Sequence, residues 1–344
     1  MKRVWLFYLS NSKYGGFVSH TVHMARSLER RGWEARIVKV GARTESRMRP
    51  FLEDREYQNV SLEDAVMLAR KDQAHITCVV WKHYGEEAEA LLRAGAGLTL
   101  HDPTEFAPDL LDLLRTERIE TTVIRPANML SLADEGIQAQ LIPQPYVPYG
   151  GLDLGQQRQN AVALSRVDWD KHTELIVEAN AQLPPEKRVE IWGAENRLFT
   201  FHTLEERWPK WREQYRGPFD GGRAAVQLAA THHYMVDMSA IKGDGGGSQY
   251  TFLEALEAGA QLVLNEAWLR DDDHTMEQVA LWVRTSDQLW AQLLERQRVP
   301  DVGSAVESLL ADHAPDRTVP PYIGYWARVR ERAGLQFLLR EAAA

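Results

Sequence analysis

The sequence predicts an α/β protein made of two doubly wound parallel-sheet domains. Apolar segments of strand length alternate with amphipathic segments of helix length in both halves of the chain, as is typical of parallel sheets covered by helices. The length of 344 residues exceeds that of one ordinary domain. The alternation stops once, at "LIPQPYVPYGGLDLGQQRQ" (141–159), where three prolines and three glycines indicate a linker.

The linker divides the chain into an expected N-terminal domain, 1–148, and an expected C-terminal domain, 149–325. The last segment, 326–344, belongs to a long helix that we expect to pack back on the first domain. Sheets of this kind bind ligands beyond the carboxyl ends of their strands. We therefore expect the two domains to face each other across a ligand-binding cleft.

The expected elements of the first domain follow one another with short connections. The helix that starts at Gly15 has Val18, Val22, Ala25 and Leu28 at helical spacing, and Gly32 ends it. The next helix starts with Ser61 as N-cap and Asp64 three residues later. We expect strands at 3–10, 34–40, 75–81, 97–102 and 121–126, and helices at 15–32, 61–71, 85–95 and 108–117.

The second domain repeats the alternation after the linker. We expect strands at 160–166, 188–193, 235–240 and 261–265. The expected helices are 171–183, a tryptophan-rich segment at 199–213, 224–234, a helix after Ser248, and the tail at 322–344.

The composition is that of a globular protein with 44% hydrophobic and 26% charged residues. No apolar run approaches the roughly 20 residues of a membrane span, and the N-terminal "MKRVWLFYLS" turns polar too early for a signal peptide. The one cysteine, Cys78, cannot form an intramolecular disulfide, and we expect it to be a buried thiol within a strand. These features favour a cytoplasmic protein.

Charge is distributed unevenly along the chain. The first 50 residues hold eleven Lys and Arg against three Glu, a net charge of +8, so the other 294 residues carry −17 of the total of −9. A basic segment on an acidic body can steer a polyanion to one face. The alternative is a solvated helix face followed by a basic loop.

Two features of the first domain lie at carboxyl ends of expected strands. Gly15 and Gly16 open a helix, where bare amides suit an anion, although the spacing is not that of a dinucleotide fingerprint. A tight turn is the alternative. His101 and Asp102 end the strand "GLTLHD", where His101 can bind a sugar or move a proton. Asp102 serves equally well as a cap before Pro103.

In the second domain, a cationic pair follows the first strand. Arg166 ends the strand and Lys171 opens the next helix, so both charges lie near the positive end of a helix dipole. An arginine can grip diphosphate oxygens bidentately, and a lysine adds a mobile point charge. Two ordinary surface cations are the alternative.

The stretch "GDGGGSQYTFLEALEAGAQLVLN" (243–265) joins flexible backbone to a helix start. We expect Gly245, Gly246 and Gly247 to leave their amides uncovered. Further unpaired amides follow in the first turn, so the segment could bind a phosphate or a sugar; its residues are Ser248, Gln249, Tyr250 and Thr251. Glu254, one turn in, can accept hydrogen bonds from two ribose hydroxyls. The buried pattern of the helix weighs against a merely flexible surface loop.

These motifs, in order "LSRVDWDKHTELIVEA", "VEIWGA", "YRGPF", "MVDMSA" and "GGGSQYTFLEALEAGAQLVLN", resemble the C-terminal domain of retaining GT-B glycosyltransferases. The resemblance implies two Rossmann-like domains and a nucleotide-sugar donor, UDP-linked. It also implies that Arg166 and Lys171 hold the diphosphate and Glu254 holds the ribose. Gly15 and Gly16 would lie near the phosphates, and His101 near the transferred sugar.

One position departs from the family pattern. Retaining GT-B enzymes usually have an acidic residue eight positions before the ribose-binding glutamate; here that position is Gly246, and Asp244 lies two residues earlier. The phage DNA α-glucosyltransferases resemble this chain in that respect, and also in the short glycine loop and the strand-end His-Asp. This resemblance implies an acceptor in double-stranded DNA that carries a hydroxymethylated pyrimidine.

The predicted function is therefore glycosyl transfer with retention of configuration. Arg43, Arg47 and Arg49 would bind DNA phosphates, and the target base would be flipped out. We expect no essential metal or cofactor, because the acidic run Asp271–Asp273 fits a solvated loop better than a metal site. Two alternatives stay open: an acceptor that is a small glycoside, lipid-linked sugar or metabolite, and an inactive nucleotide-sugar-binding protein.

Overall fold

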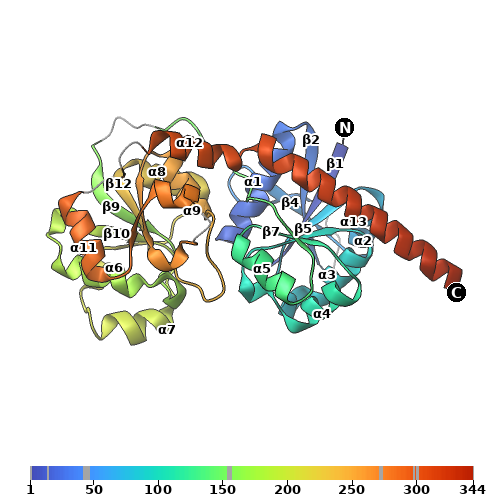
Figure 1. Ribbon diagram of the computed structural model, residues 1–344, viewed down its shortest axis with the longest axis horizontal. Helices are drawn as coiled ribbons and strands as arrows, with labels where there is room; N and C mark the ends of the chain where they lie inside the picture. The colour runs from blue at the N-terminus through green and yellow to red at the C-terminus, as the bar shows by residue number, and fades with distance from the viewer. Residues whose placement is uncertain are drawn as a thin grey trace. The chain divides into compact units, whose positions relative to one another are not determined.

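The computed structural model describes residues 2–13, 15–41, 47–152, 157–270, 274–296, 299 and 302–343. The chain forms two compact units (Figure 1). The first unit comprises residues 1–147 together with 312–344, and the second comprises 148–311. Each unit is built around its own sheet and packs its own apolar clusters against it.

The first unit contains an eight-stranded sheet with the order β3-β4-β2-β1-β5-β6-β7-β8. All neighbouring strands are parallel except the short β3, which is antiparallel to β4 at the edge. The strands are β1 Lys2–Leu9, β2 Trp33–Val40, β3 Arg49–Pro50, β4 Glu56–Val60, β5 Gln73–Val79, β6 Gly97–Leu100, β7 Thr121–Val123 and β8 Ala139–Leu141.

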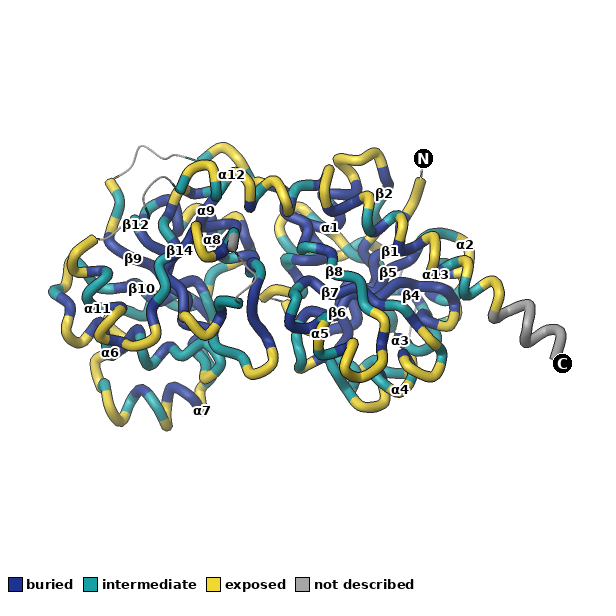
Figure 2. The backbone as a smooth tube through the Cα atoms, in the orientation of Figure 1, coloured by how far each residue is buried: buried dark blue, intermediate teal, exposed yellow. Residues whose placement is uncertain are grey.

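Helices cover the sheet of the first unit, and its central strands are buried (Figure 2). Cys78 in β5 is fully buried, as predicted, and burial raises the pKa of its thiol. The helices are α1 Gly16–Arg30, α2 Leu62–Lys71, α3 Trp81–Arg93, the 3₁₀ turn η1 Pro103–Glu105, α4 Pro108–Thr116, α5 Pro126–Asp134 and α13 Pro315–Ala343. Ser61 caps α2 by accepting the Asp64 N–H at 3.1 Å, as its sequence pattern indicates.

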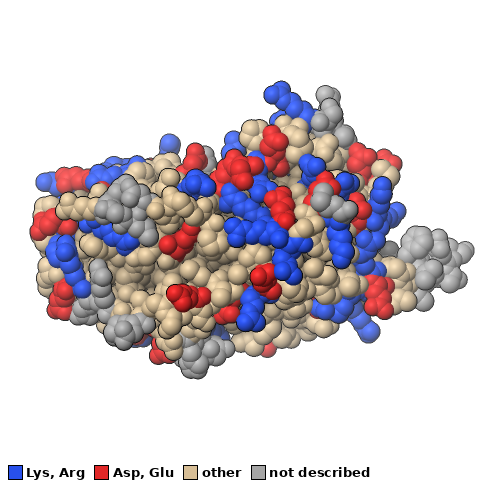
Figure 3. Space-filling model, turned by 90° about the horizontal axis from the view of Figure 1, so that it is seen from above, with Lys and Arg blue, Asp and Glu red and all other residues tan. Residues whose placement is uncertain are grey.

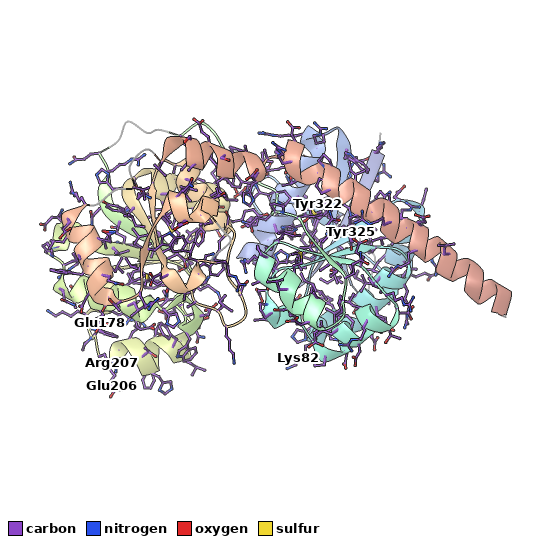
Figure 4. All side chains as sticks on the ribbon, viewed as in Figure 1. Lys82, Glu178, Glu206, Arg207, Tyr322 and Tyr325 are labelled. Carbon is purple, nitrogen blue, oxygen red and sulfur yellow. The ribbon has the colours of Figure 1, made fainter. Side chains whose placement is uncertain are left out.

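The C-terminal helix α13 belongs to the first unit and completes its core. Val319, Tyr322, Tyr325 and Trp326 pack in one apolar cluster with β1 and α1. The Trp326 indole donates to His75 Nδ1 at 3.1 Å, and the Tyr325 hydroxyl accepts from the Leu98 N–H at 2.8 Å. Figure 4 shows Tyr322 and Tyr325 extending from α13. The sequence-based boundary at 325/326 therefore falls inside this helix, because the aromatic residues before it are already part of the first core.

The second unit contains a six-stranded, all-parallel sheet with the order β11-β10-β9-β12-β13-β14. Its strands are β9 Gln159–Leu164, β10 Val189–Trp192, β11 Tyr215–Gly217, β12 His232–Asp237, β13 Gln261–Asn265 and β14 Ala280–Val283. Its helices are η2 Trp169–Lys171, α6 Thr173–Gln182, η3 Pro185–Lys187, α7 Arg197–Phe199, the π-helical η4 Thr200–Glu205, η5 Trp211–Glu213, α8 Gly221–Ala230, α9 Tyr250–Glu257, η6 Glu266–Trp268, α10 His274–Val279, α11 Ser286–Glu295 and α12 Gly303–Asp312.

One boundary in the second unit differs from the sequence-based expectation. The helix expected to reach Tyr234 ends at Ala230, and the strand expected from Met235 already starts at His232. The Thr231 hydroxyl bonds the Leu228 carbonyl and ends the helix, and His232 then pairs with Gln159 of β9. Across the described residues, no helix has both the length and the apolar character to span a bilayer.

Candidate functional site

The second unit gathers polar side chains where β9 and β12 end. These two strands are neighbours in the sheet, although β10, β11 and the helices that accompany them lie between the two in sequence. Gly193 allows the loops at this edge to approach closely. It has a φ of 150°, and a Cβ there would lie 1.9 Å from the Ser165 carbonyl oxygen. The edge of the sheet is thus built around bare backbone next to Arg166.

Lys171 lies at the centre of this group. Its ammonium donates to Ser239 Oγ at 2.8 Å and to Gln249 Oε1 at 3.3 Å, and it is partly buried. The Ser239 hydroxyl in turn donates to Asp237, which also accepts the Ser239 N–H at 2.8 Å. Within the described residues, no carboxylate pairs directly with Lys171. Its positive charge is held by neutral oxygens, an arrangement that suits an incoming anion.

Arg166 lies on the rim of the site, with 57% of its side chain exposed. Its guanidinium donates to Asp168 at 2.9 Å and to Asp170 at 2.8 Å. Asp168 is itself fixed, because it caps η2 and accepts from the Asn196 amide at 3.0 Å. Two carboxylates thus offset the charge of Arg166, so the net positive charge of the predicted pair resides on Lys171.

The glycine loop before α9 differs in part from its expectation. Gly245, Gly246 and Gly247 all have positive φ, which explains the glycines. However, the Gly246 N–H donates to the Trp268 carbonyl at 2.8 Å, so the expectation that all three amides are uncovered is wrong at Gly246. A Cβ on Gly246 would lie 2.6 Å from Arg270 Cγ, so the loop packs against the segment after β13.

The start of α9 lies beside Lys171. Gln249 is the N-cap residue, but no side chain caps the helix; the side-chain amide oxygen of Gln249 accepts from the Lys171 ammonium instead. Of the neighbouring residues, Ser248 and Tyr250 are buried and Thr251 is half-buried. The amides of the first turn and the positive end of the helix dipole therefore lie beside the Lys171 ammonium.

Glu254 is buried between α9 and the first turn of α8, with 2% of its surface exposed. A Cβ on Gly222 would lie 2.3 Å from Glu254 Oε1 and 2.1 Å from the Tyr149 hydroxyl. Gly222 thus leaves the space that the carboxylate and the phenol fill. Glu257, three residues later, accepts the Gly150 N–H at 2.8 Å and fixes the start of the unit.

In the first unit, Gly15 and Gly16 begin α1. Gly15 has a φ of 97°, which glycine favours, and no side chain caps the helix. Both residues are exposed, and a Cβ on either would meet no described atom within 4 Å. The space around this helix start is therefore open.

His101 follows β6 and is almost fully buried. Its Nε2 lies 2.7 Å from the Thr77 carbonyl oxygen, so the neutral ring carries its proton on Nε2 and leaves Nδ1 as an acceptor. The ring stands edge-on to His20 and Phe17, with centroids 4.6 and 4.9 Å away. Burial lowers the pKa of His101 to about 4. The ring is thus neutral near pH 7, which suits it to accept a hydrogen bond rather than to shuttle protons.

Asp102, predicted as a catalytic residue, serves as a cap. Its carboxylate accepts from both the N–H and the hydroxyl of Thr104 and starts η1. Sequence reasoning missed Glu105, whose buried carboxylate accepts the N–H groups of His101 at 2.5 Å and Val79 at 3.2 Å. Burial raises the pKa of Glu105. Its role is to tie together the ends of β5 and β6, which fixes His101.

Of the residues predicted to bind DNA, Arg47 and Arg49 are exposed beside β4. Arg43 lies outside the described residues, and so do Asp271–Asp273. In the described chain no three or more His, Cys, Asp or Glu side chains are grouped as a metal site. A cavity of about 620 Å³ opens in the second unit at the amino ends of β9 and β10, the edge opposite Lys171, and we assign it no part in the site.

The sequence matches no model of a known protein family, and no curated protein matches it. Solved structures, by contrast, are similar over nearly the whole chain. An α-glucosyltransferase in complex with UDP and a 13-mer DNA containing a HMU base aligns with a TM-score of 0.70 at 14% identity. That alignment covers 94% of this chain and 99% of the other.

Two further similar structures bind UDP or a UDP-sugar. HepE from Anabaena, in complex with UDP-glucose, aligns with a TM-score of 0.63 at 15% identity and covers 97% of this chain and 99% of its own. The pneumococcal O-GlcNAc transferase GtfA, in complex with UDP and GlcNAc, aligns with a TM-score of 0.64 at 10% identity and covers 95% and 99%. The fold of this chain is GT-B, with two Rossmann-like parallel-sheet units, as the sequence predicted.

Proposed function

We propose that the protein is a glycosyltransferase that uses a UDP-sugar. The observation that carries this proposal is the Lys171 ammonium, which is bonded to Ser239 and Gln249, lacks a carboxylate partner in the described residues, and lies at the uncapped start of α9. A diphosphate supplies the negative charge that this arrangement lacks. The structural similarity to proteins solved with UDP supports the same ligand.

In this proposal each feature of the second unit binds one part of the nucleotide. Lys171 and the first-turn amides of α9 bind the diphosphate, and Arg166 adds its remaining N–H groups from the rim. Glu254 accepts hydrogen bonds from the ribose hydroxyls. As the bond between the sugar and the diphosphate breaks, negative charge builds up on the leaving oxygen. Lys171 stabilises that charge electrostatically, and no metal is required.

In the proposed reaction the first unit contacts the donor and binds the acceptor. Nδ1 of His101 accepts a hydrogen bond from a hydroxyl of the transferred sugar, and the open turn at Gly15 and Gly16 accommodates the donor phosphates. We propose a front-face reaction with retention, in which the donor phosphate takes the proton of the acceptor hydroxyl. The acceptor is a hydroxymethylated pyrimidine in DNA, flipped out of its duplex.

Two observations support the DNA acceptor. The first 50 residues carry a net charge of +8, and a similar structure was solved with DNA that contains a modified base. Because position 246 is a glycine, no acidic side chain at this position can bind the donor sugar. Because positive φ and Arg270 leave no room for a side chain there, we propose that backbone groups bind the sugar.

Titration calorimetry with UDP and uridine tests the donor site. We expect Lys171→Met to weaken UDP binding at least tenfold and to change uridine binding little, because the only proposed nucleotide contact of Lys171 is to the diphosphate, which uridine lacks. Lys187→Met, in η3 at the opposite edge of the sheet, serves as control and keeps wild-type affinity. Equal affinities of Lys171→Met and wild type for UDP would refute the donor site.

Turnover tests the reaction and the acceptor. UDP-glucose and UDP-GlcNAc are each supplied with duplex DNA containing 5-hydroxymethyluracil, with unmodified DNA, or with a small glycoside. Product formed only on the modified DNA supports the proposal, and NMR of its anomeric proton reports retention. Turnover on the glycoside alone indicates the small-acceptor alternative. UDP binding with neither transfer nor donor hydrolysis indicates an inactive binding protein.

A further inference from the structure

Several described cations of the first 50 residues are ion-paired, and Lys39 is not. Those near the amino ends of the strands form ion pairs: Arg3 and Arg36 with Glu34, Arg26 with Glu53 and Asp54, and Arg31 with Asp316. Figure 3 shows Lys and Arg side chains next to Asp and Glu side chains on one face of the molecule. Exposed pairs contribute little stability, but they cancel charge locally. The positive charge that steers a polyanion must therefore come from elsewhere.

Lys39 differs from these ion-paired cations. It lies near the end of β2, at the carboxyl edge of the sheet, and its ammonium is surrounded by ring faces instead of carboxylates. Nζ is 4.9 Å from the ring centroids of Tyr8 and Tyr57 and 5.7 Å from that of Phe51. Ring faces attract the charge but accept no conventional hydrogen bond. In the described chain, none of the three N–H donors of Lys39 bonds a protein oxygen.

The surroundings of Lys39 are rigid. Tyr8 is buried and stands edge-on to Phe51, with ring centroids 5.0 Å apart. The Tyr8 hydroxyl donates to the Ser12 carbonyl at 2.8 Å, which fixes the loop that carries Lys13. Burial lowers the pKa of Lys39, and the charge of Lys13 acts in the same direction. A negatively charged ligand near both lysines would relieve the repulsion between them.

The neighbours of Lys39 link it to the candidate site of the first unit. Tyr8 and Tyr57 belong to the same apolar cluster as Phe17, which follows Gly16 at the start of α1. Phe17 also contacts the His101 ring. On the other side, Arg49 pairs directly with Tyr57 across the β3–β4 ladder, and Arg47 is exposed just before it.

We infer that Lys39 and Lys13 form a phosphate-binding subsite that holds the backbone of the acceptor DNA, with Arg47 at its border. The inference rests on the proposed function, because it places an acceptor phosphodiester beside the site that holds the sugar. The aromatic rings position the Lys39 ammonium in advance, so that a phosphate oxygen meets N–H donors already stripped of part of their water. Arg43, expected to bind DNA, is not needed for the subsite.

Salt dependence of DNA binding tests the subsite. Fluorescence anisotropy with an unmodified 20-base-pair duplex is recorded between about 50 and 200 mM salt for wild type, Lys39→Met, Lys39→Arg and Arg36→Gln. Each phosphate contact contributes about 0.9 to the slope of log affinity against log salt. We expect Lys39→Met to lose about one unit of slope and Lys39→Arg to keep the wild-type value. Arg36→Gln, the ion-paired control on the same strand, also keeps it.

The outcomes separate the subsite from the donor site. If Lys39→Met keeps the wild-type slope while circular dichroism shows it folded, the subsite is wrong. If wild type binds vesicles of anionic phospholipid and not the duplex, the DNA assignment is overturned. UDP titration of wild type reports on the donor site independently. If wild type binds UDP but Lys39→Met keeps the wild-type salt slope, only the subsite is overturned. If wild type does not bind UDP, the proposed function is overturned.

Discussion

Lys171 and Lys39 occupy comparable places in the two units and differ in what surrounds them. Each is a partly buried lysine at the carboxyl edge of a parallel sheet, without a carboxylate partner in the described residues. Lys171 is bonded to a hydroxyl and an amide oxygen, whereas Lys39 faces three aromatic rings. Oxygens fix an ammonium at one point, which suits charge development at a single bond. Rings leave its N–H groups unused, which suits a polyanion that binds and releases.

The largest effect that follows from this comparison concerns turnover. Lys171→Met removes a charge positioned for the leaving diphosphate, so we expect kcat to fall by about 10²- to 10³-fold. Steady-state kinetics with a UDP-sugar and the modified duplex measures the change. Lys39→Met should raise KM for DNA instead and leave kcat within about threefold. Equal kcat losses for the two variants would abolish the distinction between the lysines.

Gly222→Ala probes the packing that holds Glu254 in place. The added Cβ would approach Tyr149 and Glu254 within 2.3 Å, and overpacking of this kind costs about 1–3 kcal/mol. We expect the free energy of unfolding to fall by that amount in urea denaturation, and UDP affinity to fall with it. Gly303→Ala in α12, where a Cβ meets no described atom, is the matched control. An unchanged midpoint for Gly222→Ala would show that the pocket is loose.

Acid affects the two units differently. Burial lowers the pKa of four histidines in the first unit, to about 4 for His101, to about 3 for His75 and well below 6.5 for His20 and His23. In the second unit, burial lowers the pKa of His232. Below pH 6.5 the unfolded chain binds protons that the folded unit does not, so stability is full above pH 6.5 and declines as pH falls.

We therefore expect the first unit to lose roughly 1 kcal/mol per buried histidine for each pH unit below 6.5. Hydrogen exchange followed by peptide mass spectrometry at pH 7 and pH 5.5, corrected for the intrinsic exchange rate, resolves the units. Protection should decline mainly in peptides from β1, β5 and β6. A decline in β10 and β12 as large as that in the first unit would contradict the assignment, because burial lowers the pKa of four histidines there and of His232 in the second unit.

The smallest effect concerns stability at the two lysines. Lys39→Met replaces an ammonium among rings with an apolar side chain of similar length, so we expect its free energy of unfolding to stay within about 0.5 kcal/mol of wild type. Lys171→Met leaves the Ser239 and Gln249 oxygens without their donor and should cost about 1 kcal/mol more. Thermal melts of the two variants measure this order, and the reverse order would show that the rings bind Lys39 more tightly than the oxygens bind Lys171.

Local sequence patterns predicted the alternation of elements, because each strand and helix carries its own periodicity. They also predicted that Lys171 and the start of α9 matter, since both lie where a strand meets a helix. The contact of Lys171 with Ser239, 68 residues away, depends on β9 lying next to β12. That adjacency follows from the order of strands in the sheet, which the spacing of residues along the chain does not predict.

The errors have similar causes. The amide of Gly246 was expected to be uncovered, but Trp268 approaches from beyond β13 and accepts its N–H. The sequence did not indicate a role for Gly222, because its role is to leave space for the side chains of Glu254 and Tyr149. For Asp102 the sequence left open a catalytic role and a cap before Pro103; the structure shows the cap, and the catalytic role stays a prediction. Such outcomes depend on tertiary neighbours.

The contribution of α13 to the first core sets an order for biosynthesis. The interior of β5 and β6 receives its last partners, Tyr325 and Trp326, from residues that leave the ribosome after the entire second unit. A nascent chain can complete the second unit early, but the first must wait, with His75 and Leu98 uncovered, until translation is nearly finished. Premature termination before residue 315 would therefore yield a chain whose earliest-made half is the one left unfinished.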